Sequence, residues 1–191
     1  MHKIWVSDDD NAIRIILEES LSSSGFDVKT FSSGDDVVNE LKNDKPDLIL
    51  TDVQMPGMLG YDLLKHINNN FDDLPVIVMT AFADMQAAVE SFGGGAFEYL
   101  PKPFDLEEAT KIVERALEEK PKTKGLKLDN KLDIIGESQA MQNVFRAIGK
   151  LSSTIATVLI QGESGTGKEL IAKSLHKNSP RHDMPFIALN M

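Results

Sequence analysis

The sequence predicts an α/β fold in which a parallel sheet is covered by helices on both faces. Through the first 119 residues, short apolar runs alternate with amphipathic segments of helical length, which is the pattern of strands joined by crossover helices. Several runs are apolar and β-branched throughout, as expected for strands that are buried on both faces. The 191 residues are enough for one complete domain of this kind and a smaller second segment.

Five strands and five helices alternate in the first domain. The strand candidates are the apolar runs Lys3–Ser7, Val28–Phe31, Leu48–Thr51, Val76–Thr80 and Glu98–Leu100. The helix candidates are the amphipathic segments Ile13–Ser23, Gly34–Asn43, Tyr61–Asn69, Met85–Phe92 and Leu106–Glu119. Five strand–helix units in about 119 residues fit a flavodoxin-like doubly wound five-stranded parallel sheet. We therefore assign residues 1–119 to one domain.

The rest of the chain is shorter and less regular. Residues 120–132 contain one glycine, one proline and little apolar periodicity, which is typical of a linker. Residues 133–191 then predict a turn and a helix, a buried strand at Thr157–Ile160, a second helix and, from Pro185, the start of another strand. This order of elements indicates an incomplete α/β segment after the first domain.

The composition excludes several classes of protein. There are no cysteines, so disulfides and thiolate metal sites are not available and a reducing cytoplasm is the expected compartment. The N-terminus lacks the pattern of a signal peptide, and no apolar run approaches the roughly 18 residues of a membrane span. The net charge of −10 is concentrated in the first 118 residues, where 23 acidic residues outnumber 9 basic ones. We therefore do not expect this part to bind nucleic acid directly.

Polar side chains follow four of the predicted strands in the first domain. They are Asp8, Asp9 and Asp10 after the first strand, Asp52 after the third, Thr80 at the end of the fourth and Lys102 after the fifth. Ligands of open parallel sheets bind outside these carboxyl ends. Converging carboxylates repel one another unless a cation lies between them, and an all-oxygen cluster suits Mg²⁺. A hydroxyl and a lysine across the same site suit a phosphoryl group.

Each of these residues also has a purely structural explanation. An Asp after a strand more often caps a helix or forms a turn, and a Lys before a proline is usually just exposed. Four such positions at the ends of four predicted strands favour one shared functional site over four separate coincidences.

Four segments resemble the signatures of bacterial response-regulator receiver domains. They are DDDNAIR, LILTDVQMPGMLGYDLL, VIVMTAFA and FEYLPKPFD, and together they extend through residues 1–119. The resemblance implies that Asp52 is the phosphoacceptor. It further implies that Mg²⁺ is bound by Asp8, Asp9, Asp52 and the backbone carbonyl of Gln54, so that Asp10 is an extra acid.

The same resemblance implies the roles of the remaining site residues. Lys102 would pair with the phosphoryl oxygens, and its peptide bond to Pro103 is expected to be cis. Thr80 would be the hydroxyl of a conformational switch, and Tyr99 the aromatic residue that changes position with it. Phosphorylation of Asp52 would thus be a local charge event that biases a two-state element.

A glycine-rich turn follows the strand predicted in the second segment. The sequence GESGTGK, residues 162–168, matches the frame G-x-x-x-x-G-K between a strand and a helix. Backbone N–H groups of such a loop surround phosphates, and Lys168 would reach the terminal ones. The predicted ATP-binding residues of the loop are Gly162, Glu163, Ser164, Gly165, Thr166, Gly167, Lys168 and Glu169. Glu169 departs from the general motif, which has Ser or Thr for Mg²⁺ at this position.

The second segment resembles the opening of the AAA+ ATPase domain of activators that serve the enhancer-dependent sigma factor, sigma-54. The similar segments are DIIGESQAMQNVFRAIGKL, LIQGESGTGKELIAKSLHKNSPR and PFIALNM, and Glu169 is the form found in that family. The resemblance implies that Ile135 and Gly136 pack near adenine. A receiver domain followed by this opening resembles the NtrC family of nitrogen regulators.

The NtrC resemblance implies a cytoplasmic activator of nitrogen-assimilation genes. A sensor histidine kinase, NtrB-like, would phosphorylate Asp52, and the phosphorylated parent would form dimers or oligomers and hydrolyse ATP. Contacts with sigma-54 RNA polymerase and with enhancer DNA would come from parts beyond residue 191, and no membrane is involved. Since this chain lacks the expected hydrolytic residues, we expect it to take up phosphate on Asp52 but to hydrolyse ATP negligibly.

Two other functions are compatible with parts of the pattern. A stand-alone phosphorylation-dependent interaction module, without ATPase or DNA-binding activity, would keep the second segment only for dimerisation or as a vestige. A metabolic kinase would use the glycine-rich loop directly. The carboxylate cluster and the two-part layout argue against the metabolic kinase.

Overall fold

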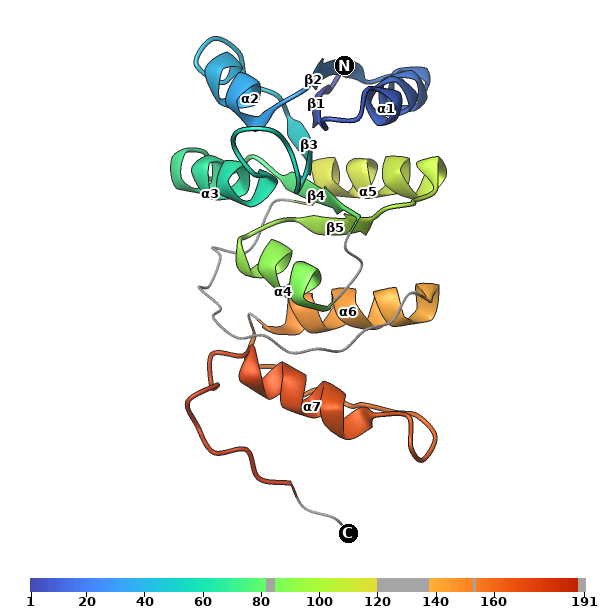
Figure 1. The fold of residues 1–191 in the computed structure, drawn as a ribbon, viewed down its shortest axis with the longest axis vertical. Coiled ribbons are helices and arrows are strands. Elements are labelled where there is room, and N and C mark those ends of the chain that lie inside the picture. Colours follow the sequence, from blue (N-terminus) through green and yellow to red (C-terminus); the bar gives the residue numbers. More distant parts are fainter. Residues whose placement is uncertain (82–84, 120–137, 153, 189–191) are drawn as a thin grey trace.

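A computed structural model of the chain describes residues 1–81, 85–119, 138–152 and 154–188 (Figure 1). The predicted linker, residues 120–132, lies outside the described residues. Among the described residues, no helix is both long enough and apolar enough to cross a membrane.

The first domain contains a five-stranded parallel sheet. Its strands are β1 (Lys3–Ser7), β2 (Asp27–Phe31), β3 (Leu48–Asp52), β4 (Val76–Thr80) and β5 (Glu98–Pro101). They lie in the order β2, β1, β3, β4, β5, and all four pairings are parallel. The predicted fold class is confirmed, and each strand ends within one residue of its prediction.

Helices cover both faces of this sheet. They are α1 (Asn11–Ser23), α2 (Gly34–Glu40), α3 (Gly60–Asn70), α4 (Met85–Gly93) and α5 (Leu106–Glu118). Helices α1 and α5 lie on one face and α2 and α3 on the other, whereas α4 lies beside β5 (Figure 1). The doubly wound arrangement predicted from the alternating pattern is therefore present.

The two faces of the sheet have separate hydrophobic cores because successive side chains of a strand point to opposite faces. In β4, Ile77 and Met79 pack with residues of α1 and α5, and Val76 and Val78 pack with residues of α2 and α3. All four side chains are buried. This two-sided burial explains why the strand is apolar at four successive positions, from Val76 to Met79, rather than at alternate ones.

Three helices of the first domain begin after a side chain that accepts a backbone N–H of the first turn. The capping residues are Asp10 for α1, Ser33 for α2 and Asp105 for α5. The first N–H groups of a helix have no partner within the helix, so such a cap stabilises it by about 1 kcal/mol. For α1, the cap also fixes the point at which the chain leaves the acidic end of β1.

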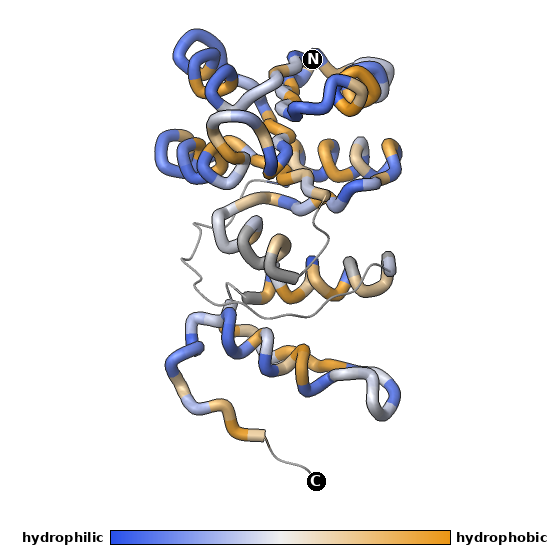
Figure 2. The backbone as a smooth tube through the Cα atoms, viewed as in Figure 1, coloured by the Kyte–Doolittle hydropathy of each residue, from blue (hydrophilic) through white to orange (hydrophobic). Residues whose placement is uncertain are grey.

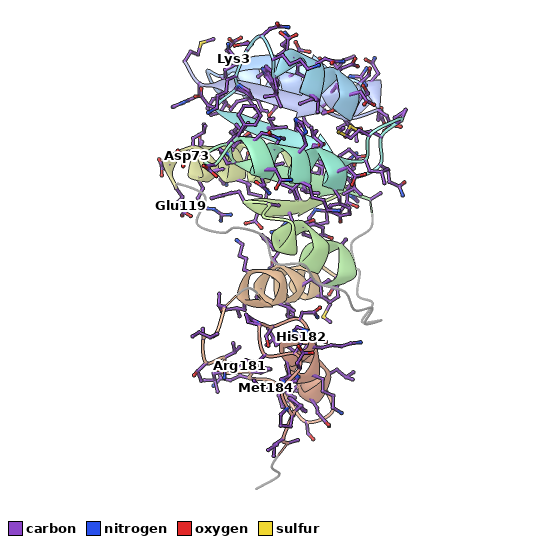
Figure 3. All side chains as sticks on the ribbon, turned by 90° about the vertical axis from the view of Figure 1, so that its left-hand side faces the viewer. Lys3, Asp73, Glu119, Arg181, His182 and Met184 are labelled. Carbon is purple, nitrogen blue, oxygen red and sulfur yellow. The ribbon has the colours of Figure 1, made fainter. Side chains whose placement is uncertain are left out.

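Two further helices lie below the sheet in Figure 1, α6 (Gln139–Ser152) and α7 (Lys168–Lys177). Phe145 and Ile148 of α6 are buried against Phe92 of α4 and Tyr99 of β5. Helix α7 packs against α6 in turn. Figure 3 shows the same order from the side, with Lys3 near one end of the molecule and Arg181, His182 and Met184 near the other.

The strand predicted at Thr157–Ile160 is wrong for the described chain. These residues have no sheet pairing, and Leu159 is 81% exposed. Residues 185–188 also form no strand, and the rest of that prediction lies outside the described residues. A strand is stabilised by cross-strand neighbours, and none of the described strands lies beside either run. Leu159, Phe186 and Ile187 therefore remain exposed, and Figure 2 shows that the end of the described chain is hydrophobic.

Gly60 lies where helix α3 passes directly over the end of β3. A Cβ atom at this position would be 2.0 Å from the backbone oxygen of Asp52. We predict that Gly60→Ala lowers the free energy of unfolding by about 1–3 kcal/mol, because the backbone of β3 or α3 must shift to relieve the contact. Urea unfolding measures this, followed by the fluorescence of Trp5, which is the one tryptophan of the chain and is fully buried.

The matched control is Asn69→Ala, at an exposed position of the same helix. This change should alter the free energy of unfolding by no more than about 0.5 kcal/mol. Equal stability of Gly60→Ala and the wild-type chain would mean that the approach of α3 to Asp52 is looser than described.

Candidate functional site

The sheet register brings the ends of four strands to one edge. Ser7 lies beside Thr51 across the β1–β3 pair, so that Asp8 follows next to the end of β3. Asp52 is the last residue of β3, one position later than predicted for the strand. The strand ends thus gather the predicted residues Asp8, Asp9, Asp52, Thr80 and Lys102 at this edge.

Lys102 joins the two buried carboxylates of the site. Its ammonium Nζ lies 2.6 Å from Oδ2 of Asp8 and 2.9 Å from Oδ1 of Asp52. The Asp8 side chain is fully buried, and those of Asp52 and Lys102 are 7% and 15% exposed. Because little water reaches these groups, their charges interact more strongly than surface charges do. The peptide bond from Lys102 to Pro103 is cis, as the family resemblance implied.

Asp9 completes a group of three carboxylates. One ligand oxygen each of Asp8, Asp9 and Asp52 lies within 4.8 Å of the other two. Three carboxylates face the single ammonium of Lys102, so the cluster carries about two excess negative charges. This donor set fits a hard divalent cation, and a site with few protein ligands and room for water is typical of Mg²⁺. The acidic cluster therefore fits magnesium binding.

The surroundings shift the pKa of two of these groups. Burial raises the pKa of the Asp52 carboxyl above its usual value; Lys102 opposes this rise and Asp8 adds to it. Burial alone would lower the pKa of Lys102, but hydrogen bonds to Asp8 and Asp52 outweigh burial and raise it. The ammonium therefore stays charged, and Asp52 is more basic than an exposed aspartate.

Asp10 and Gln54 form hydrogen bonds with backbone and side-chain groups at the acidic cluster. Asp10 accepts the N–H of Ala12 as the cap of α1, at 2.8 Å, and its own N–H donates to Oδ1 of Asp8 at 3.0 Å. The N–H of Gln54 donates to Oδ2 of Asp52 at 3.1 Å. Asp10 thus has a structural position beside the cluster, whereas a metal-binding role for the Gln54 carbonyl stays a prediction.

The two predicted switch residues lie in neighbouring strands but in different surroundings. Thr80 is buried at the end of β4, beside the acidic edge. Tyr99 is fully buried on the other side of β5, among Phe92 of α4 and Phe145 of α6. Tyr99 thus packs against α4 and α6, and its role as a switch residue stays a prediction.

The predicted phosphate loop directly precedes α7, which lies on the far side of α6 from the sheet that carries this cluster (Figure 1). Gly165 and Gly167 have φ values of 82° and 84°, which only glycine adopts readily. Lys168 donates to the carbonyls of Gly162 and Glu163 at 3.0 and 2.6 Å. The loop is thus folded back on its own lysine.

Glu169, Ile135 and Gly136 are the other predicted nucleotide-binding residues. Glu169 points away into an exposed ion pair with Lys173, at 2.7 Å, which lowers the Glu169 pKa. Ile135 and Gly136 lie outside the described residues. The sequence prediction of ATP binding by these three residues remains a prediction.

Glu98 is a polar residue that the sequence interpretation missed. Its side chain is only 3% exposed, and Oε2 forms ion pairs with Arg115 of α5 and, at 2.6 Å, with Lys150 of α6. A second ion pair, Arg146 to Glu108 at 2.8 Å, also joins α6 to α5. The available signal was a glutamate inside a predicted buried strand, which requires a cationic partner.

Comparison with known families matches both parts of the chain. The family described as "Response regulator receiver domain" matches residues 4–114, and the family described as "Sigma-54 interaction domain" matches residues 134–191. The first match includes all five strands of the sheet and the acidic cluster.

Curated relatives are similar along nearly the whole chain. The DNA-binding transcriptional regulator NtrC of Escherichia coli (strain K12) is 51% identical over 192 residues, which cover 98% of this chain and 41% of that protein. The protein of the same name from Azospirillum brasilense is 44% identical over 193 residues, covering 98% and 40%. The chain therefore spans about two fifths of the length of these relatives.

Solved structures give the same two-part similarity. The apo receiver domain of nitrogen regulatory protein C, solved in solution, is 48% identical, with a TM-score of 0.56 over 61% of this chain and 94% of that one. The crystal structure of NtrX from Brucella abortus in complex with ATP is 28% identical, with a TM-score of 0.58 over 99% of this chain and 43% of that one.

We predict that Mg²⁺ stabilises the fold through the acidic cluster. At a concentration about 100 times Kd, the ion should raise the free energy of unfolding by about 2.7 kcal/mol, since it binds the folded chain. Asp9→Asn should remove most of this effect by withdrawing one ligand charge. Thermal unfolding with and without MgCl₂ measures both.

Asp10→Asn is the matched control, because asparagine also caps helices well. Its Mg²⁺-dependent stabilisation should equal that of the wild-type chain. The opposite result, with Asp10→Asn insensitive to Mg²⁺ and Asp9→Asn normal, would show that the ligands are Asp8 and Asp10.

Proposed function

Because this chain belongs to the family of response regulator receiver domains, we propose that it is the control part of a two-component transcription activator and is phosphorylated on Asp52. One observation carries this proposal. A buried aspartate at the end of the central strand is paired with Lys102, next to two further carboxylates that fit Mg²⁺. This set supplies a nucleophile, a fixed cation and a metal site, the three parts that phosphoryl transfer requires.

The proposed reaction is in-line phosphoryl transfer from a phosphohistidine of a sensor kinase. A carboxylate oxygen of Asp52 attacks phosphorus, the P–N bond breaks, and the imidazole nitrogen leaves with the electron pair. Lys102, already 2.9 Å from Asp52, pairs with the phosphoryl oxygens. Asp8, Asp9, Asp52 and the carbonyl of Gln54 would hold Mg²⁺, which supplies charge neutralisation on the transferring group.

The signal is proposed to leave the site through Thr80 and Tyr99. Thr80 lies at the end of β4, from which its hydroxyl would bind the new phosphoryl group. A shift of Thr80 opens space next to β5, and Tyr99 moves with it. Since Tyr99 packs against Phe145 of α6, its movement would alter the packing of α6 against α4. This contact offers a physical route from phosphorylation to the second segment.

The second segment supports a wider role. Its match to the sigma-54 interaction domain and its glycine-rich loop favour ATP binding by Gly162–Lys168, Glu169, Ile135 and Gly136 in a longer parent protein. The proposed parent is a cytoplasmic activator of nitrogen-assimilation genes that oligomerises on phosphorylation. Its partners would be an NtrB-like kinase, sigma-54 RNA polymerase and enhancer DNA. The proposed domains are residues 1–119 and 133–191, joined by the linker 120–132.

The stand-alone interaction module is not favoured. Similarity to the NtrC relatives extends through 98% of this chain, including the second segment that such a module would not need. The buried contact between α6 and Tyr99, one of the two proposed switch residues, also argues that the second segment takes part in the function.

Labelling with a small phosphodonor tests the acceptor. We predict that the chain incorporates phosphate from acetyl phosphate in the presence of Mg²⁺ and that Asp52→Asn abolishes this, because an amide oxygen cannot form the acyl phosphate. Phos-tag electrophoresis detects the product, and intact-mass measurement shows that the mass of the chain has increased by about 80 Da. Asp73→Asn, an exposed aspartate away from the site, is the control and should label normally. Undiminished labelling of Asp52→Asn would mean that another residue accepts the phosphate.

Docking of α6 is tested separately from the chemistry. Removing a buried ring costs about 3–5 kcal/mol of packing, so we predict that Phe145→Ala releases α6 from α4. Amide exchange in both helices should then become at least about tenfold faster, since 1.4 kcal/mol corresponds to tenfold. Hydrogen–deuterium exchange resolves this segment by segment.

Asn143→Ala is the matched control, because Asn143 is exposed on the same helix. Its exchange should equal that of the wild-type chain. Unchanged exchange in Phe145→Ala would remove α6 from the proposed signalling route while leaving the phosphorylation proposal intact.

A further inference from the structure

Arg14 lies in the first part of α1 and reaches back to the loop that follows β1. Its guanidinium Nη1 donates to the carbonyl of Asp8 at 2.7 Å and to that of Asp9 at 3.0 Å. Nη2 donates to Oδ1 of Asn11 at 2.9 Å. One guanidinium group thus binds three oxygen atoms within the segment 8–11.

The two carboxylates held by this loop differ in their other support. Asp8 is buried, its side chain is bound by Lys102 and by the N–H of Asp10, and its own N–H donates to Phe31. Asp9 is exposed, and within residues 1–81 and 85–119 its carboxylate accepts no hydrogen bond and forms no ion pair. Arg14 therefore holds the Asp9 carbonyl directly, in addition to the bonds that hold its neighbours Asp8 and Asp10.

We propose that Arg14 is a positioning residue for the divalent cation, because its guanidinium fixes the 8–11 loop so that the Asp9 carboxylate faces Asp52. The inference rests on the proposed Mg²⁺ site. Without the clamp, the exposed Asp9 must lose conformational freedom each time the ion binds, which lowers affinity. Partners that orient metal ligands in this way typically contribute 10- to 100-fold to metal affinity.

Simple electrostatics makes the opposite prediction. Arg14 places a positive charge next to a cation site, so its removal would by itself attract Mg²⁺ more strongly. The two effects differ in sign, and one measurement separates them. Loss of the clamp weakens Mg²⁺ binding, whereas loss of the charge alone tightens it.

Isothermal titration of the 191-residue chain with MgCl₂ tests the proposal. Arg14→Met keeps the apolar stem and removes the donors, and we expect about tenfold weaker Mg²⁺ binding. Arg14→Lys keeps the charge but cannot donate to two carbonyls and Asn11 at once, so it should also bind Mg²⁺ several-fold more weakly. Lys111→Met, an equal charge change at an exposed site, should match the wild-type chain.

Acetyl phosphate labelling gives a second readout. Weaker labelling of Arg14→Met at low Mg²⁺ should be restored at saturating Mg²⁺, which a damaged acceptor would not allow. Equal or tighter Mg²⁺ binding by Arg14→Met overturns the inference. Absence of Mg²⁺ binding by the wild-type chain overturns the proposed metal site itself and this inference with it.

The folding of each variant is checked by the emission of Trp5. If Arg14→Met does not fold, Asn11→Ala removes one oxygen from the clamp and should weaken Mg²⁺ binding by a smaller factor, about two- to threefold. Unchanged affinity in Asn11→Ala would then overturn the proposal.

Discussion

Lys102 lies between the carboxylates of Asp8 and Asp52, and the functional part of the molecule is arranged around this pair of contacts. Two buried carboxylates repel each other, and each would destabilise the fold without a partner. The parallel register of β1, β3 and β5 brings their ends close enough for one ammonium to satisfy both. Asp9 adds a third negative charge, and the single ammonium of Lys102 neutralises only one of the three. The remaining negative charge favours binding of a divalent cation.

The second segment contacts the first domain through an interface with apolar residues at its centre and ion pairs around them. Phe145 and Ile148 supply the buried area, and the pairs of Glu98 with Lys150 and of Glu108 with Arg146 fix its orientation. Burial contributes the free energy and complementary charges contribute specificity. The aromatic residue at the centre of this contact, Tyr99, belongs to the same strand that leads to Lys102, so the acidic edge and the α6 interface share one rigid element.

The sequence was sufficient to predict the sheet because its central strands β3 and β4 are mostly apolar for a local reason, burial between two layers of helices. The acidic edge followed from the general position of ligands in such sheets. The strand at Thr157–Ile160 failed because a strand also needs neighbours, and periodicity does not report them. The packing of α6 depends on where segments far apart in the sequence pass one another. The Arg14 contacts and the close approach at Gly60 are local in sequence, but they depend on the exact path of the backbone, which a residue pattern does not report.

The burial of Tyr99 beneath α6 has a thermodynamic consequence for both parts of the chain. Coupling between two equilibria is reciprocal, so any factor by which the proposed phosphorylation would shift α6 between docked and free states equals the factor by which docking would shift the phosphorylated conformation. If the phosphorylated state favours a free α6, then a docked α6 opposes that state by the same free energy. Helix α6 would then disfavour the phosphorylated conformation of the receiver domain. A chain lacking residues 138–188 would populate that conformation more readily than the chain described.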